Sequence, residues 1–135
     1  MNPIIRSILA IVLGLVVGSA INMGIIMIST SVIPPPEGVD ITTMEGLVEN
    51  MHLMQPINFL MPFLAHAFGT LAGATVAALI ATNQKIKFAM AIAVLFLIGG
   101  TINVFMLPSP LWFNVVDLLG AYVPMGWLGW RLASK

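Results

Sequence analysis

The sequence contains very little charge. Only 7% of its 135 residues are Asp, Glu, Lys or Arg, whereas an ordinary soluble domain has about 25%. A soluble fold of this length must cover most of its surface with polar side chains, which five acidic and five basic residues do not allow. A nucleic-acid binder would need a basic patch, and the net charge is +0. The composition therefore excludes a soluble globular domain, a disordered chain and a nucleic-acid-binding protein.

Cysteine is absent altogether. This excludes a disulfide framework, a thiolate metal site and a cysteine nucleophile. The sequence also has no glycine-rich phosphate loop and no nucleophile elbow. We therefore expect a protein that has no catalytic residues, uses no cofactor and is not an enzyme.

Long hydrophobic runs are what the chain does have. Hydrophobic residues make up 59% of it and the mean hydropathy is +1.05. Four stretches each exceed the roughly 18 residues of a membrane-spanning candidate; they are residues 4–30, 57–82, 86–107 and 111–132. Pro62 and Pro124 fall within two of them, and each is expected to kink its helix because it lacks a backbone donor. The expected fold is an all-α integral membrane protein, a four-helix bundle forming one domain over residues 1–135.

The few charges are sorted by position. The basic residues all lie at the chain ends or between the second and third stretches, at Arg6, Lys85, Lys87, Arg131 and Lys135. The loop of residues 33–56 has only acidic ones, at Glu37, Asp40, Glu45 and Glu49. By the positive-inside rule, we expect both termini and the loop at 83–87 to be cytoplasmic. The corresponding location is a bacterial inner membrane, with the lipid bilayer as the first partner.

An internal repeat is predicted from two similar segments. Gly18, Ile21 and Asn22 recur as Gly99, Ile102 and Asn103, at an offset of 81 residues. The second and fourth stretches also align, at an offset of 54, so the two hairpins would form a parallel repeat. Chance similarity between apolar segments is the alternative. We favour duplication because asparagine is a costly residue within a membrane span.

Small residues at four-residue spacing indicate where helices pack. Because lipid provides no hydrophobic reason for helices to associate, close backbone approach must hold the bundle together. The candidate packing glycines are Gly14, Gly18, Gly69, Gly73, Gly99 and Gly100. Packing within the chain is the first interpretation, and a self-association face is the alternative.

Polar residues inside the spans gather in the half nearer the acidic loop. This intramembrane polar cluster consists of Asn22, His66, Asn103, Asn114 and Asp117. At about 1.5 Å per helical residue, the first two lie roughly 12–14 Å from the span ends and Asp117 about 9 Å. Ionisable groups in spans are functional candidates, and His66 and Asp117 could form a pair. Interhelical hydrogen bonding of Asp117 to Asn114, another asparagine or His66 is the first interpretation, and a pair that relays protons or holds an ion is the alternative.

The loop of residues 33–56 is predicted to contain one short amphipathic helix, at about 42–54. Thr42 and Glu45 resemble a capping box. An apolar face would lie on the membrane surface or cap the bundle; it comprises Met44, Leu47, Val48, Met51 and Met54. Glu45, Glu49 and His52 share the opposite face, where a solvated surface is the first interpretation and a mononuclear zinc or calcium site the alternative.

Two functional hypotheses follow. The first is a non-enzymatic component of a membrane assembly, which packs against a second copy or another membrane protein. The second is a small carrier or channel for an ion, proton or solute that uses the polar cluster. A metal-binding membrane protein is a further alternative. A carrier requires polar access from both faces, which a packing component does not need.

Overall fold

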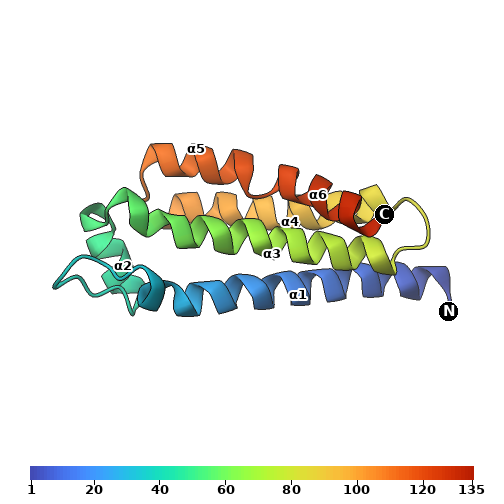
Figure 1. The fold of residues 1–135 in the computed structure, drawn as a ribbon, viewed down its shortest axis with the longest axis horizontal. Helices are drawn as coiled ribbons and strands as arrows, with labels where there is room; N and C mark the ends of the chain where they lie inside the picture. Colours follow the sequence, from blue (N-terminus) through green and yellow to red (C-terminus); the bar gives the residue numbers. More distant parts are fainter.

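The computed structural model describes all 135 residues, and the fold is entirely helical (Figure 1). Four segments are long and apolar enough to cross a membrane. They are α1 (Pro3–Val32), the segment Pro56–Ile80, α4 (Lys85–Met106) and the segment Leu111–Ala133. This confirms the predicted all-α fold with four long apolar helices.

The second span begins with a 3-10 turn, η2 (Pro56–Phe59), which continues into α3 (Leu60–Ile80). Pro62 is the third residue of α3 and therefore lies in its first turn. The amides of a first helical turn have no partner within the helix, so a proline there does not disrupt it. The kink predicted at Pro62 is wrong for this reason.

The fourth span is broken into two helices, α5 (Leu111–Gly120) and α6 (Val123–Ala133). Ala121 and Tyr122 lie between them, and Pro124 occupies the first turn of α6. The distortion predicted for this span is therefore present, although it comes just before the proline.

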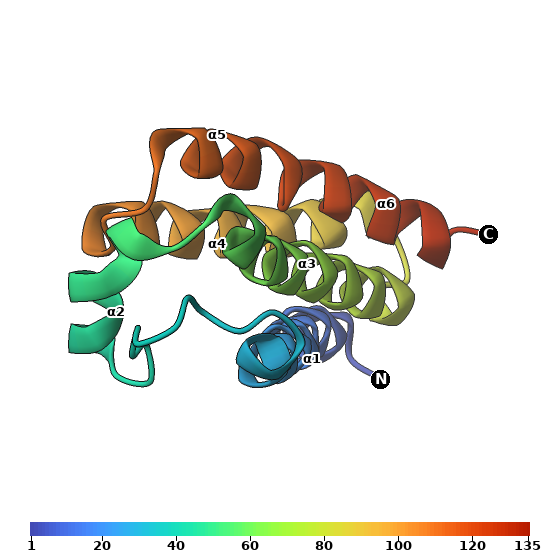
Figure 2. The ribbon, with the colours of Figure 1, turned by 60° about the vertical axis from the view of Figure 1, so that its left-hand side comes forward.

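Helix α3 lies at the centre of the bundle. It packs against α1 on one side and against α4 and α6 on the other, so that α1 is set apart from the α5–α6 pair (Figure 2). Two pairs of glycines bring α1 and α3 into backbone contact. A Cβ on Gly14 would lie 2.8 Å from the carbonyl oxygen of Gly73, and one on Gly18 would lie 2.7 Å from that of Gly69. Only glycine allows this approach, because any side chain would overlap the opposite backbone.

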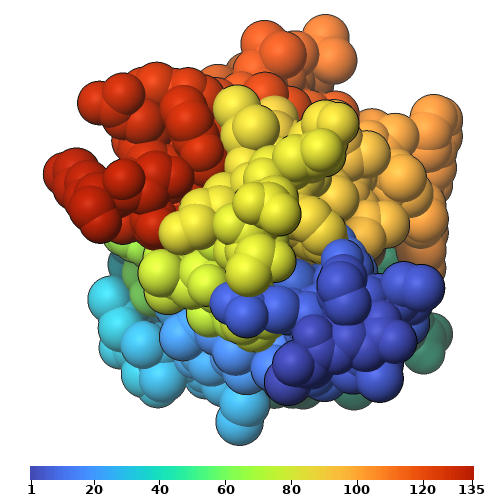
Figure 3. Space-filling model, turned by 90° about the vertical axis from the view of Figure 1, so that its right-hand side faces the viewer, coloured from blue at the N-terminus to red at the C-terminus, as the bar shows by residue number.

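Both chain termini and the loop between α3 and α4 lie at one end of the bundle, here called the terminal end (Figure 3). Basic side chains bind the last carbonyls of helices there. Arg6 donates from Nε to the backbone oxygen of Ile80 at the end of α3, and Lys85 donates to Ala133 at the end of α6. The half of the bundle next to this end has a tightly packed core, formed by Ala74, Ala77, Ala78, Ala89, Ile92 and Ala133.

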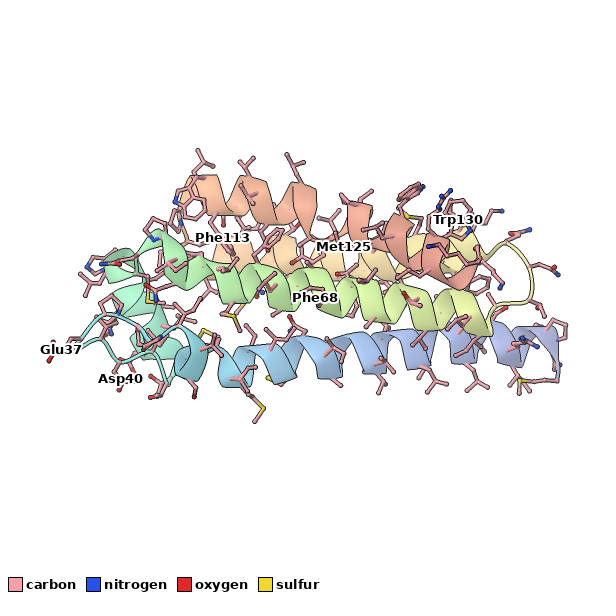
Figure 4. The ribbon with its side chains drawn as sticks, viewed as in Figure 1. Glu37, Asp40, Phe68, Phe113, Met125 and Trp130 are labelled. Atoms are coloured by element: carbon pink, nitrogen blue, oxygen red, sulfur yellow. The ribbon has the colours of Figure 1, made fainter.

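The opposite end, here called the α2 end, is covered by α2 (Met44–Asn50) and the 3-10 turn η1 (Met51–Leu53). Met51 is buried against Phe59 and Phe113, with Leu47 and Met54 packed beside it. The acidic Glu37 and Asp40 project from this end, far from Trp130 at the other (Figure 4). Leu47, Met51 and Met54 thus pack against the bundle, whereas Met44 and Val48 of the predicted apolar face are exposed.

The capping residue of α2 differs from the prediction. Thr43, not Thr42, accepts the hydrogen bond from the backbone N–H of Gly46, at 3.0 Å. The Thr42 hydroxyl instead donates to Asp40. The helix is also shorter than expected, because α2 ends at Asn50 and a 3-10 turn follows.

Candidate functional site

His66 on α3 and Asp117 on α5 are in hydrogen-bond contact inside the bundle. The distance from His66 Nδ1 is 2.8 Å to one carboxylate oxygen of Asp117 and 3.0 Å to the other. Tyr122, at the break before α6, donates its hydroxyl to Asp117 Oδ2 at 3.3 Å, and its ring stacks on His66 with centroids 5.9 Å apart. Asp117 is only 4% exposed. Two side chains, one from α3 and one from the break between α5 and α6, therefore contact one carboxylate.

A cavity of about 270 Å³ lies next to this pair, between α1, α3 and α4. His66 and Tyr122 line it, and Asp117 lies behind them and does not. The other lining residues are Gly18, Ser19, Asn22, Gly69, Thr70, Phe96, Gly99, Gly100 and Asn103. Ser19, Gly99 and Asn103 are exposed, so the cavity opens at the surface between α1 and α4. Six of its eleven lining residues have polar side chains, so it is a mixed polar and apolar space within four otherwise apolar spans.

Asn22 supplies the one buried side-chain nitrogen or oxygen atom without a hydrogen-bond partner. Its Oδ1 is buried and accepts no hydrogen bond from the protein. An unsatisfied buried acceptor costs roughly 1–3 kcal/mol, so such atoms are rare unless water or a ligand binds them. Because Asn22 lines the cavity, its oxygen marks a position that a donor can occupy.

Two small features shape the cavity walls. Thr70 is buried and donates its hydroxyl to the backbone oxygen of His66, one turn earlier, at 2.8 Å. Gly100 leaves room for Tyr122, because a Cβ there would overlap the tyrosine hydroxyl. The absence of a side chain at Gly100 thus lets Tyr122 reach Asp117.

Asn22, His66, Asn103 and Asp117 lie in or directly behind one cavity, but Asn114 does not. It accepts a hydrogen bond from the Ser109 hydroxyl at 2.6 Å, at the beginning of α5. The structure therefore does not place Asn114 in the cavity lining with the others, and a local partner five residues away bonds its amide.

Of the six candidate packing glycines, Gly99 is the exception. A Cβ at Gly99 would meet no atom within 4 Å, whereas the other five face neighbouring helices. Gly99 lines the cavity and does not pack against another helix of the chain.

The loop residues Glu45, Glu49 and His52 form no metal centre. The structure holds no group of three or more His, Asp or Glu side chains that could bind a metal ion. His52 lies in η1, beyond the end of α2, so the helical spacing that would have aligned it with Glu49 is interrupted. The structure therefore does not bring these side chains together as a metal centre, and a metal site in this loop stays a prediction.

Sequence reasoning missed Tyr122, the only tyrosine in the chain. Its hydroxyl was the available signal, because a buried tyrosine hydroxyl usually requires a partner and Asp117 is five residues away. Ser19, Thr70 and Phe96 were also missed, since their place in the cavity depends on how the helices cross.

No family model matches the chain, and no curated protein or solved structure matches it either.

Proposed function

We propose that this small polytopic membrane protein is a non-enzymatic carrier of an ion, proton or small polar solute, with the cavity as its binding site. One observation supports this above all others: a partly polar cavity lies inside an apolar bundle and contains the unpartnered oxygen of Asn22. Polar groups within spans usually serve a substrate or ion pathway when they line a cavity. A protein that acts only by packing has no use for such a space.

The two halves of the bundle support a carrier over an open channel. The cavity occupies one half, and the alanine-rich core closes the other half next to the terminal end. A carrier needs a site that is closed towards one face while it is open towards the other. A continuous pore would require polar groups through both halves.

The arrangement also supports a role without catalysis. Ser19 and His66 line the same cavity, yet no hydrogen bond joins them. A serine nucleophile requires a base within hydrogen-bonding reach. His66 bonds Asp117 through Nδ1, as a triad histidine also does, so only the missing contact between His66 and Ser19 disfavours hydrolysis.

Single-cysteine accessibility tests the carrier, and the chain provides a natural cysteine-free background. Ser19→Cys and Asn103→Cys should react with a membrane-impermeant thiol reagent added at the face of the α2 end. Ile21→Cys and Ile102→Cys are matched controls, because both isoleucines are exposed and do not line the cavity. Slower labelling from the opposite face is also expected, since a carrier must open to both sides.

Equal reactivity of the cavity and control cysteines would contradict a hydrated site. If the cavity cysteines are labelled from one face only under every solute condition, the protein binds a solute but does not transport it, and the carrier proposal is refuted.

A packing component is the second candidate function. It is favoured by the exposure of Ser19, Gly99 and Asn103, a polar strip that a helix of a second copy or partner protein would cover. Oxidation of Gly99→Cys in native membranes tests this. A disulfide-linked dimer would favour packing, whereas a monomer that remains reactive to the impermeant reagent would favour the carrier.

The proposed location is a bacterial inner membrane with both termini in the cytoplasm. The segregation of all five basic residues to the terminal end supports this orientation. We also propose that the two hairpins arose by duplication. In support, Asn22 and Asn103, the repeated asparagines, line the same cavity from α1 and α4.

A further inference from the structure

We infer that the solute of this cavity is a small ammonium ion, meaning a protonated amine of a few heavy atoms. The inference rests on the proposed function and names its substrate class. Charge, hydrogen-bonding capacity, ring placement and size each support it.

The charge around the cavity is negative. No Lys or Arg lines it, and the five basic residues all lie towards the terminal end. The carboxylate nearest to it is Asp117, directly behind His66, and the four other acidic residues lie in the loop at the α2 end. Charges of one sign near a low-dielectric cavity attract counter-ions and repel ions of like charge. The site therefore favours a cation over an anion.

The protein presents hydrogen-bond acceptors to the cavity. Asp117 contacts His66 at Nδ1, and no protein group bonds Nε2; in the neutral imidazole with its proton on Nδ1, Nε2 is an acceptor. Asn22 Oδ1 is a second acceptor without a partner. A primary ammonium group has three donors on one atom and can bind both.

Aromatic rings complete the lining. Tyr122 and Phe96 both border the cavity, and the Tyr122 ring lies parallel to His66, with 24° between their planes. The face of an aromatic ring attracts ammonium groups, and this attraction increases where water is excluded. The rings would also contact the short alkyl part of an amine.

The cavity is small. Its volume of about 270 Å³ lies just below the roughly 300–1,000 Å³ of pockets for drug-sized ligands. A short alkylammonium ion fits this limit. The same ammonium chemistry also occurs in the headgroup of an aminophospholipid, which could enter from the side because the cavity opens between α1 and α4.

Equilibrium binding to the full chain in nanodiscs tests the inference. The probes are radiolabelled ethylammonium, the neutral analogue ethanol and the anion acetate, all in discs of phosphatidylcholine. Ethylammonium should bind saturably. Ethanol and acetate should bind at least about tenfold more weakly, because neither has a positive charge or three N–H donors.

Two variants and one control locate the site. Asn22→Leu removes the unpartnered acceptor, and Asp117→Asn removes the charge that orients His66; each should weaken ethylammonium binding about tenfold or more. Asn114→Leu is the matched control, because its side chain pairs with Ser109 outside the cavity, and it should bind normally. Circular dichroism and thermal unfolding establish that each variant folds.

The outcomes are separable. Preferential binding of acetate or ethanol would overturn the ammonium inference, and so would normal binding by both folded variants. Loss of ethylammonium binding when phosphatidylethanolamine is added would support the ammonium chemistry and identify the lipid headgroup as its source. Failure of all three probes would overturn the substrate class, while the cysteine labelling of Ser19 and Asn103 reports independently on the carrier.

Discussion

At the scale of single residues, Asp117 shows how a carboxylate is accommodated inside this bundle. An ionised group at membrane depth is costly, and such groups are found facing the protein interior with partners. Asp117 is 4% exposed, contacts His66 Nδ1 with both oxygens and accepts a hydrogen bond from Tyr122. The contacts that satisfy the carboxylate also hold the imidazole in one orientation. Asp117 is therefore a positioning residue for the cavity, because it does not line it.

Asp40 provides a prediction about pH outside the membrane spans. The Thr42 backbone N–H and hydroxyl donate to Asp40 Oδ1 at 2.9 and 2.7 Å, and they hold the pKa of this carboxyl below its usual range. Because the pKa is lower in the folded loop, ionised Asp40 stabilises the loop above about pH 4. This contribution is lost as the pH falls through the folded-state pKa. Hydrogen exchange should show protection of the Thr42 amide decreasing with acid.

Asp40→Asn is the control for this effect. An amide does not titrate, so protection of the Thr42 amide in the variant should change little over the same pH range. An identical acid dependence in the variant would show that another group is responsible.

Part of the site could be predicted residue by residue, and part could not. His66 and Asp117 are the histidine and the one carboxylate inside the spans, and the cost of leaving either unpaired makes their contact foreseeable. The local pairing of Asn114 with Ser109 depends on the turn before α5, which hydropathy does not report. Tyr122 reaches Asp117 across the helix break, a geometry that an unbroken helix would not have.

At the scale of elements, the α1–α3 contact depends on glycine backbones. A Cβ added at Gly73 would lie 2.6 Å from the carbonyl oxygen of Gly14, which belongs to a helix and cannot move aside alone. Gly73→Ala should therefore destabilise the protein by about 1–3 kcal/mol, the usual cost of overpacking. Thermal unfolding in detergent measures the change.

Gly24→Ala is the matched control on α1. A Cβ there would meet nothing within 4 Å, so the variant should be neutral or gain up to about 1 kcal/mol from helix propensity. Equal destabilisation by both substitutions would show that the two helices are not in contact at these glycines.

The sequence predicted the positions of the four spans more accurately than it predicted the irregularities within them. Runs of apolar residues are long enough to show four spans whatever their neighbours are. Proline alone did not locate the distortions: Pro62 lies in a first turn, whereas the break near Pro124 falls at Ala121 and Tyr122. Thr42 and Thr43 are equally able to cap a helix, and only the Asp40 contact with Thr42 distinguishes them.

At the scale of the whole molecule, charge segregation predicts the orientation in the membrane. If the terminal end is cytoplasmic, cysteines at Gly38 and Ser109 should react with an impermeant reagent in intact cells, and one at Asn83 should not. Both of the first two positions belong to the α2 end, and Asn83 lies in the loop between α3 and α4. Labelling of Asn83→Cys alone would show the inverted orientation.

The arrangement of the four spans was not predictable from hydropathy. The most apolar window belongs to α1, with a mean hydropathy of 2.4, yet only 17% of it is buried. The window of Pro56–Ile80 has a value of 1.7 and is 44% buried. Because lipid is as apolar as a protein core, hydropathy does not determine which helix becomes central. Small residues determine which helix becomes central, since α3 contacts its neighbours through glycine and alanine.

The α1–α3 pair is held together by contacts at three positions along its length. Arg6 binds the Ile80 carbonyl at the terminal end, the glycine backbones touch in the middle, and Asn58 donates to the Pro34 carbonyl at the α2 end. Sliding or rotation of one helix along the other would break all three contacts at once. The pair therefore forms a rigid unit. In the proposed carrier, transport requires other helices to move relative to this unit.

Helix α5 has the opposite character. No glycine brings its backbone against that of α3, and it is held through side chains, with Phe113 against Phe59 of η2 and Asp117 against His66 of α3. Side-chain contacts can be exchanged without moving a backbone, and the break at Ala121 and Tyr122 provides a hinge. In the proposed carrier, α1 and α3 would therefore stay fixed while α5 moves relative to them. Asp117 lies on the moving helix, one turn before the break at Ala121.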